Sequence, residues 1–142
     1  MKRFIYIIVI ILFACSTGAS GQIINVRGAT MVFNGATVQI NGSLRMASGS
    51  NVTQTGGEVY ITGEWTDSSG FAATGGRVNF TGSTDRTITG SAPSTFWNLR
   101  INKNSGNILG LDQNADVDNN LAVAGGIFRY YNTRNGTQAA QT

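Results

Sequence analysis

The amino-acid sequence predicts an all-β protein, a parallel β-helix or β-solenoid with coils of about 19–21 residues. The phrase TGGEVYITG (residues 55–63) returns as TGGRVNFTG (residues 74–82), 19 residues further along the chain. Short stretches of alternating apolar residues recur between Gly, Asn and Ser. After residue 21, no window shows the three-and-four apolar spacing of an amphipathic helix. A β-sandwich is the alternative, because Asn-Gly pairs also suit hairpin turns.

The composition agrees with a β protein and argues against nucleic acid as a partner. Charged residues make up 12% of the 142 residues, and 19 residues are Gly. The net charge of +3 includes two basic residues, Lys2 and Arg3, at the amino terminus. Because no basic stripe with interleaved aromatic residues remains after them, we expect no nucleic-acid binding.

The first 21 residues are predicted to be a secretory signal peptide. The basic start precedes an unbroken apolar run over residues 4–14. That run is too short for a helix that spans a bilayer, which needs about 20 residues. Small residues at the junction predict cleavage between Gly21 and Gln22. We therefore expect the chain to be secreted or displayed on the outer cell surface.

A second processing scheme remains open. The stretch Leu12-Phe13-Ala14-Cys15 is similar to a lipobox, in which Cys15 would be lipidated and would become the mature amino terminus. The bulky Phe13 suits that motif poorly, so cleavage before Gln22 is favoured. An outer-membrane lipoprotein anchored through Cys15 is the alternative. Under the favoured scheme no cysteine remains, so stability must come from backbone ladders and packing.

Each predicted strand contributes inward-facing apolar residues at alternate positions. In chain order, the first pairs are Met31 with Phe33, Val38 with Ile40, Val59 with Ile61, and Val78 with Phe80. The later inward residues are Trp97, Leu99 and Ile101, then Leu109 and Leu111, then Val117, Leu121 and Val123. These strands place the solenoid domain at residues 22–131, and residues 132–142 are expected to be an unstructured or truncated tail.

The two copies of the repeated phrase predict which residues stack between coils. The expected neighbours are Val59 with Val78, Ile61 with Phe80, and Glu58 with Arg77. The first two pairs would make the interior continuous, and the third would be an opposite-charge pair on the outer surface. The glycines persist because the turns between strands often require a positive φ.

The run from Gly57 to Phe128 resembles the coils of large secreted β-solenoid, adhesin-like surface proteins of Bacteroidota-type Gram-negative bacteria. The matching residues are Val78, Phe80 and Gly82, then Ile88 and Gly90, then Phe96, Asn98, Leu99, Ile101 and Lys103, and finally Leu121, Gly125 and Gly126. The resemblance implies export, surface display and a structural or adhesive role. It also implies a carboxy-terminal sorting domain, which residues 129–142 do not resemble, so we expect a fragment of a longer protein.

Catalytic and metal chemistry find little support in the residue types. The chain has no histidine, which excludes the triads and zinc sites that need one. Asp112, Asn114 and Asp116 have the spacing of a calcium loop, but Val117 and Val123 stand where that loop needs Gly and Glu. We therefore expect neither an enzyme nor a cofactor, and we interpret this stretch as solvated turns with asparagines stacked between coils.

Two aromatic residues are candidates for carbohydrate stacking, since flat rings suit the C–H groups of sugars. Tyr60 is expected to face outward on its strand, and Trp65 is expected in a loop. Trp97 is assigned to the core because it shares a face with Leu99 and Ile101.

The sequence thus predicts a secreted or surface-displayed, non-catalytic structural module of adhesin-like character. A carbohydrate-binding or polysaccharide-degrading β-helix is the alternative. The expected partners are surface glycans, other cell-surface proteins, or a second copy bound through an exposed end of the solenoid.

Overall fold

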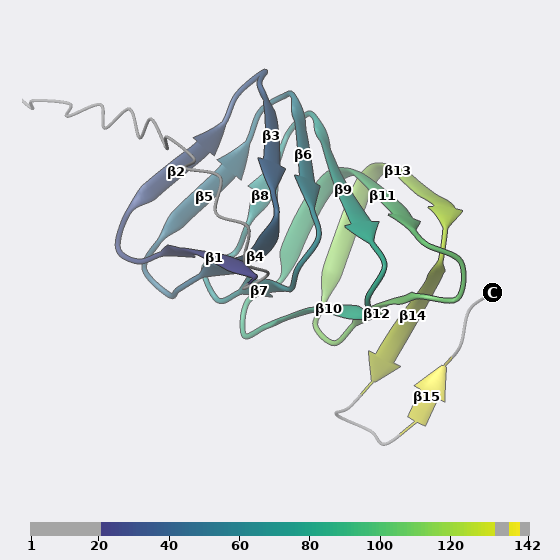
Figure 1. Cartoon of the computed structure of the whole chain (residues 1–142). Coiled ribbons are helices and arrows are strands. Elements are labelled where there is room, and N and C mark those ends of the chain that lie inside the picture. Colours follow the sequence, from purple (N-terminus) through teal and green to yellow (C-terminus); the bar gives the residue numbers. More distant parts are fainter. Residues whose placement is uncertain (1–20, 133–136, 140–142) are drawn as a thin grey trace, which may run out of the picture.

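The computed structural model describes residues 21–132 and 137–139, and every regular element in these ranges is a β-strand (Figure 1). The strands are β1 (Gln22–Val26), β2 (Thr30–Phe33), β3 (Thr37–Ile40), β4 (Gly42–Met46), β5 (Asn51–Gln54), β6 (Glu58–Ile61), β7 (Trp65–Asp67), β8 (Ala72–Ala73), β9 (Arg77–Gly82), β10 (Arg86–Gly90), β11 (Ser94–Lys103), β12 (Ile108–Leu111), β13 (Ala115–Gly125), β14 (Ile127–Asn132) and β15 (Thr137–Ala139). The described ranges hold no helix with the length and hydropathy to cross a membrane.

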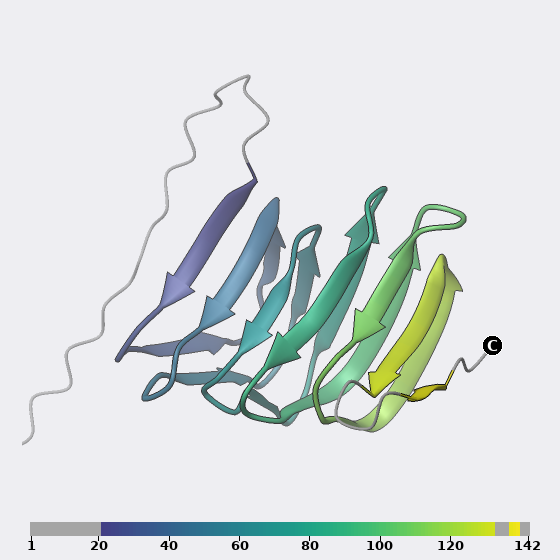
Figure 2. The same cartoon turned by 90° about the horizontal axis from the view of Figure 1, so that it is seen from below.

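The strands build a β-solenoid of about five coils, which confirms the predicted fold class. Sheet A, with the order β1-β4-β7-β10-β12-β14-β15, forms one wall, and Figure 2 shows its strands side by side. Sheet B contains β2, β5 and β8 on one side and β3, β6 and β9 on the other, joined through the long strand β11, with β13 paired to β11. All of these ladders are parallel except β14 with β15.

The coil length varies more than the sequence predicts. Opposite residues are 19 positions apart between β6 and β9, where Glu58 lies opposite Arg77. They are 23 positions apart between β7 and β10, where Trp65 lies opposite Ile88. The corners between strands absorb the difference, so the parallel ladders continue despite the unequal loops.

The repeated phrase is two successive coils stacked in register, as predicted. Val59 lies opposite Val78 and Ile61 lies opposite Phe80, and all four side chains are buried. Outside, Arg77 Nη1 lies 3.2 Å from Glu58 Oε1. The inward residues of this phrase are apolar because they contact the coils on both sides.

The earliest predicted pair belongs to a different side of the coil. Met31 and Phe33 turn toward the interior, but β2 pairs with β5, so Met31 lies opposite Val52 and Phe33 opposite Gln54. The inward direction predicted for Met31 and Phe33 is therefore confirmed, and their strand belongs to another side of the coil than the repeated phrase. One coil holds two similar strands separated by a corner, and alternation alone does not tell them apart.

An aromatic cluster fills the middle of the interior. Trp65 contacts Phe71, with ring centroids 4.9 Å apart and nearly perpendicular planes, and Phe96 at 5.3 Å. Phe80 lies 6.0 Å from Trp65 on another side. Such pairs contribute about 0.5–1.5 kcal/mol each beyond the burial of their area. The cluster joins β7, β9 and β11, which come from two coils and from all three sides of the solenoid.

The glycines of the repeated phrase lie where the backbones of successive coils meet. Gly57 and Gly76 have φ values of +75° and +82°. A Cβ atom on Gly57 would lie 2.2 Å from the Ala36 carbonyl oxygen, and one on Gly76 would lie 2.7 Å from the Gly57 carbonyl oxygen. Only glycine satisfies both the conformation and the contact, which is why the phrase keeps it.

The far end of the stack differs from the expected unstructured tail. Asn132 belongs to β14, and Thr137–Ala139 form β15, which pairs antiparallel with Tyr130–Asn132. These residues therefore have strand structure, and whether the tail is truncated stays a prediction. A returning segment can pair there because β14 otherwise presents a free edge of N–H and C=O groups. The other residues of the predicted tail lie outside the described ranges.

Candidate functional site

A network of polar side chains lies on the outer side of β6, β9 and the second half of β11, here called the Glu58 face. It comprises Glu58, Tyr60, Arg77, Asn79 and Arg100. Strand alternation places these residues outward because Val59, Val78 and Leu99 between them point into the core. Parallel pairing then brings Tyr60 opposite Asn79, and Asn79 opposite Arg100.

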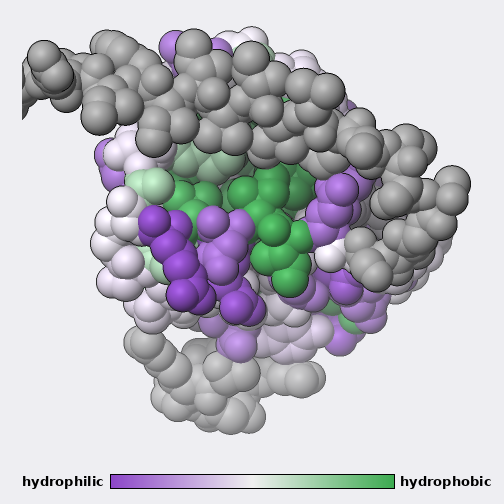
Figure 3. All heavy atoms as spheres, turned by 60° about the vertical axis from the view of Figure 1, so that its left-hand side comes forward, coloured by the Kyte–Doolittle hydropathy of each residue, from purple (hydrophilic) through white to green (hydrophobic). Residues whose placement is uncertain are grey.

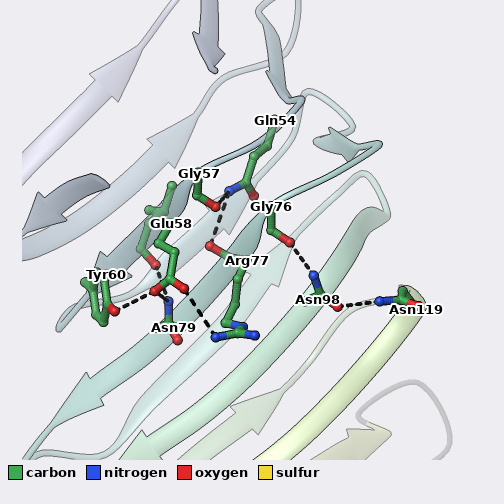
Figure 4. A network of polar contacts seen from close by, with 10 residues as sticks. Gln54, Gly57, Glu58, Tyr60, Gly76, Arg77, Asn79, Asn98 and Asn119 are labelled. Carbon is green, nitrogen blue, oxygen red and sulfur yellow. Dashed lines mark hydrogen bonds and ion pairs between the residues drawn. The ribbon is translucent and has the colours of Figure 1, made fainter. Parts of the chain in front are cut away.

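The carboxylate of Glu58 is the centre of this face (Figure 4). Tyr60 Oη donates to Glu58 Oε2 at 2.5 Å. Asn79 Nδ2 donates to the same oxygen at 3.3 Å, and Arg77 Nη1 donates to Oε1 at 3.2 Å. Three donors from two coils therefore fix this carboxylate, which is engaged in holding the surface together.

The hydrogen bond to Glu58 changes the acidity of Tyr60. It raises the pKa of Tyr60, because it holds the phenolic proton, and partial burial and the negative charge of Glu58 act in the same direction. The positive charges of Arg100 and Arg77 lower the pKa by a smaller amount. Tyr60 is consequently a neutral hydrogen-bonding aromatic residue at ordinary pH, with its ring half-buried.

Asn79 lies beneath the surface and keeps one unused acceptor. Its side chain is buried, and Nδ2 is used by Glu58 and by the Val59 carbonyl oxygen. Its Oδ1 atom has no hydrogen-bond partner among the described residues. A buried acceptor of this kind is uncommon, because leaving it unpaired costs about 1–3 kcal/mol. Tyr60 and Arg100 flank it on the neighbouring strands.

Side-chain amides beside this face close the corners between coils. Gln54 Nε2 donates to the carbonyl oxygens of Gly57 and Arg77, at 3.3 and 3.2 Å. Asn98 Nδ2 donates to the Gly76 carbonyl oxygen at 2.7 Å, and Asn119 Nδ2 donates to Asn98 Oδ1 at 2.8 Å (Figure 4). The predicted stacking of asparagines between coils is confirmed at Asn98 and Asn119.

Trp65 does not belong to any exposed site. It is the first residue of β7 and is fully buried, and its Nε1 atom donates to Ser94 Oγ at 3.2 Å. Its expected place in a loop, and with it the proposed role in carbohydrate stacking, is therefore wrong. The alternation of β7 turns Trp65 and Asp67 inward together, so the ring has no face available to a sugar.

Trp97 is the exposed tryptophan, contrary to its assignment to the core. Its relative exposure is 36%, whereas Phe96 before it is fully buried. A register shift between Phe96 and Asn98, in the pairing of β11 with β13, breaks the strict alternation. Sequence analysis missed Trp97 because that shift is not marked by a glycine or a proline.

A buried polar cluster joins three coils at the corner after β7. Asp67 accepts hydrogen bonds from the backbone N–H groups of Ser69, Gly70 and Phe71. Ser94 Oγ donates to Asp67 Oδ2 at 2.7 Å and accepts from Gln113 Nε2 at 2.8 Å. The Asp67 carboxylate is fully buried and shapes this corner, so we assign it a structural role.

The described residues contain no group of three or more His, Cys, Asp or Glu side chains arranged to hold a metal ion. Asp112 lies at the corner after β12, and Asp116 is exposed near the start of β13.

The predicted processing sites lie at or beyond the start of the described structure. Gly21 is exposed and Gln22 opens β1. Cys15 and the rest of the predicted signal peptide lie outside the described residues. Cleavage before Gln22, or lipidation of Cys15, stays a prediction.

No protein-family model, curated protein or solved structure matches the chain significantly. The β-solenoid architecture implied by the resemblance is present. The link to Bacteroidota-type surface proteins has no family match to support it and stays an expectation.

Proposed function

We propose that the chain is a secreted or surface-displayed structural module, non-catalytic and adhesin-like, whose stacked coils hold an outer surface at a fixed geometry. Its candidate partners are surface glycans and other cell-surface proteins. Support comes from the stiffness that continuous parallel ladders and a shared core give to stacked coils. The predicted signal peptide supports export.

One observation carries the proposal: in the repeated phrase the inward side chains stay apolar from one coil to the next, while the outward side chains change in character. Val59 and Val78 are identical neighbours in the core. On the outside, Tyr60 lies opposite Asn79 in the same ladder, and Asn79 opposite Arg100. A scaffold needs this division, since outer side chains can then vary without disturbing the fold.

The engaged carboxylates support a structural role over catalysis. Glu58 is held by Tyr60, Asn79 and Arg77. Glu64 accepts from the Thr87 N–H at 2.6 Å, and Asp85 accepts from the Ile108 N–H at 2.8 Å. A glycosidase needs two carboxyl groups that flank a bond of the substrate, and these carboxylates are instead occupied by contacts between coils.

Expression in a Gram-negative host tests export and display. We expect the processed chain to begin at Gln22, to reach the culture medium or the outer surface, and to be accessible there on intact cells to an antibody against an added carboxy-terminal tag. A chain that keeps residues 1–21 and stays inside the cell would contradict the proposal. A lipidated amino terminus at Cys15, abolished by Cys15→Ser, would support display through the alternative anchor.

Carbohydrate recognition is the second candidate, and the Glu58 face favours it. Tyr60, with a half-buried ring, and Arg100 lie on the two strands that flank Asn79, and the buried Asn79 Oδ1 acceptor between them is unpaired in the described part of the chain. Trp97 adds an exposed ring on β11. Incubation with a polysaccharide panel separates recognition from degradation, because only a degrading enzyme releases new reducing ends.

A further inference from the structure

We infer that the Glu58 face binds an acidic segment of a partner protein, with Arg100 holding a carboxylate of that segment and Asn79 Oδ1 accepting an N–H group next to it. The inference rests on the proposed function, in which other cell-surface proteins are candidate partners, and it names the chemistry of one such partner. The two residues lie on β9 and β11, and each of these strands is paired on both sides, so the site does not depend on the ends of the solenoid.

Arg100 is a cation without an anionic partner in the described part of the chain. It is half-buried on the outer side of β11, and its side chain makes no hydrogen bond or ion pair with the described residues. Its outward neighbours along the strand are Asn98 and Asn102, and across the ladder they are Asn79 and Ala122. None of these side chains is acidic. The planar guanidinium is therefore available to bind a carboxylate through two parallel hydrogen bonds.

Asn79 supplies an acceptor that the described residues leave unused. The residue is only 1% exposed. Its Nδ2 atom donates to Glu58 Oε2 at 3.3 Å and to the Val59 carbonyl oxygen at 3.5 Å, which fixes the orientation of the amide group. Oδ1 consequently lies on the side of the amide away from Glu58 (Figure 4), and it has no partner among the described residues. An N–H group from outside would remove the cost of this unpaired acceptor.

The two side chains are close enough to bind one ligand group. Asn79 and Arg100 lie directly opposite each other in the ladder between β9 and β11, and neighbouring strands are about 4.8 Å apart. Since Oδ1 is buried in the free chain, a side chain must move before a ligand reaches it. No hydrogen bond or ion pair with the described residues holds Arg100 in place, so we expect its guanidinium to move toward the carboxylate and to open the way to Oδ1.

The face itself shows how a protein carboxylate is held beside Asn79. On one side, Glu58 accepts from Asn79 and from Arg77 Nη1, at 3.3 and 3.2 Å. On the other side, Arg100 is present and the carboxylate is missing. The two arginines and the one carboxylate leave the face with one excess positive charge, which favours an anion. Because the internal example is a Glu side chain, an Asp or Glu of a protein segment is favoured over an acidic polysaccharide.

A hollow beside β1 and β2 is a competing place for a peptide. Its volume is about 920 Å³, and Ile24, Met31 and Phe33 are among the residues that line it. Figure 3 brings this side of the molecule forward and shows hydrophobic side chains in its middle with hydrophilic ones beside them. Arg27 also lines the hollow, so an acidic peptide bound there would depend on Arg27 and not on Arg100.

An NMR titration of the full chain tests the site through the Nε–H signals of its arginines. The probe is a short peptide of alternating Glu and Gly, and its control has Gln in place of Glu. Both are added at about 0.15 M salt, which screens non-specific attraction. We expect the acidic peptide to shift the Arg100 signal and the Gln peptide to leave it unchanged.

Three arginine variants locate the binding. Arg100→Gln should weaken the binding of the acidic peptide about tenfold, because charge-assisted hydrogen bonds are lost. Arg45→Gln is the matched control, since it removes the same charge from an exposed position of β4 on sheet A. Arg27→Gln is the control for the hollow. Both controls should change the affinity less than about twofold, and circular dichroism verifies that all three variants are folded.

The role of Asn79 is tested by changing the peptide, which leaves the fold untouched. A peptide with N-methylated Glu residues lacks the N–H group next to each carboxylate. We expect it to bind several-fold more weakly than the unmethylated peptide, since one hydrogen bond is lost. Equal binding of the two peptides would remove Asn79 from the site.

The inference is overturned if the acidic peptide does not bind at concentrations up to about 1 mM, or if Arg100→Gln and Arg45→Gln weaken it equally. A loss in Arg27→Gln alone would place the peptide in the hollow. Tighter, Arg100-dependent binding of an acidic oligosaccharide of matched charge would show that the partner is a polysaccharide and would also overturn it. Absent peptide binding by a chain that is exported normally leaves the proposed display intact, whereas failed export contradicts that proposal without affecting this titration.

Discussion

At several positions in this solenoid, the atoms of the adjacent coil restrict which amino acid can be accommodated. Gly57 and Gly76 combine a left-handed backbone with a carbonyl oxygen of the preceding coil directly above the missing side chain. Gly106 has a similar φ of +82° but nothing within 4 Å of where its Cβ would lie. The comparison separates the cost of the backbone conformation from the cost of the contact.

We expect Gly106→Ala to lower the free energy of unfolding by about 1–2 kcal/mol, the cost of a left-handed conformation. Gly57→Ala adds the overlap with the Ala36 carbonyl oxygen and should cost more than about 3 kcal/mol. Urea unfolding followed by circular dichroism measures both. Equal losses in the two variants would show that the contact between coils is unimportant at Gly57.

The pKa of the Tyr60 hydroxyl is a measurable indicator of the hydrogen bond to Glu58. Since its hydrogen bond to Glu58 raises its pKa, Glu58→Gln should return the pKa toward the ordinary value of about 10. A raised pKa in the folded state means that the contribution to stability is present below that ordinary value and is lost as the pH rises through the folded-state pKa. NMR titration of labelled tyrosines, with Tyr60→Phe for assignment, measures the shift. An unchanged titration in Glu58→Gln would contradict the assigned hydrogen bond.

At the scale of elements, polar pairs link neighbouring strands but contribute less than the core. Glu58 and Arg77 have side chains that are 36% and 42% exposed, so water screens their attraction. The aromatic contacts of Trp65, by contrast, are fully buried. We therefore assign most of the stability of the stack to the buried interior. The exposed polar pairs determine which outward side chains lie side by side in neighbouring strands.

A double-mutant cycle with Glu58→Gln and Arg77→Gln should give a coupling free energy of about 0.2–1 kcal/mol. The matched cycle combines Glu58→Gln with Arg86→Gln, because Arg86 pairs instead with Glu64. That second cycle should be additive. Thermal unfolding measures both. Coupling in the second cycle equal to that in the first would mean that the direct ion pair is not its source.

At the scale of the whole molecule, periodicity predicted the fold because a fixed repeat leaves few architectures. The stacking of Val59 on Val78, and of Glu58 on Arg77, followed from the 19-residue spacing alone. For the two tryptophans the prediction was the reverse of the structure: Trp65 was expected at the surface and is buried, and Trp97 was expected in the core and is exposed. Trp97 turns outward at a register shift that has no marker in the sequence, and Trp65 turns inward because its strand starts where a loop was expected.

The antiparallel strand β15 was missed for a related reason. Its pairing with β14 depends on an edge that exists only once the coils have stacked. The open ends follow the same logic, since Leu121 has the alternation of a core residue and is exposed only because of its place in the stack. In β13 the alternation predicts that Leu121 turns toward the interior, and the position of the coil in the stack decides whether the side chain is covered.

The central functional claim is that the chain is a structural scaffold rather than a carbohydrate-recognition module. A glycan array probed with the folded chain, beside a Tyr60→Ala and Trp97→Ala variant and a Thr66→Ala control on sheet A, tests it most directly. The scaffold account predicts that no glycan is bound in a way that depends on Tyr60 or Trp97. Specific binding that survives Thr66→Ala and disappears in the aromatic variant would contradict that account and would make the Glu58 face a carbohydrate-binding site.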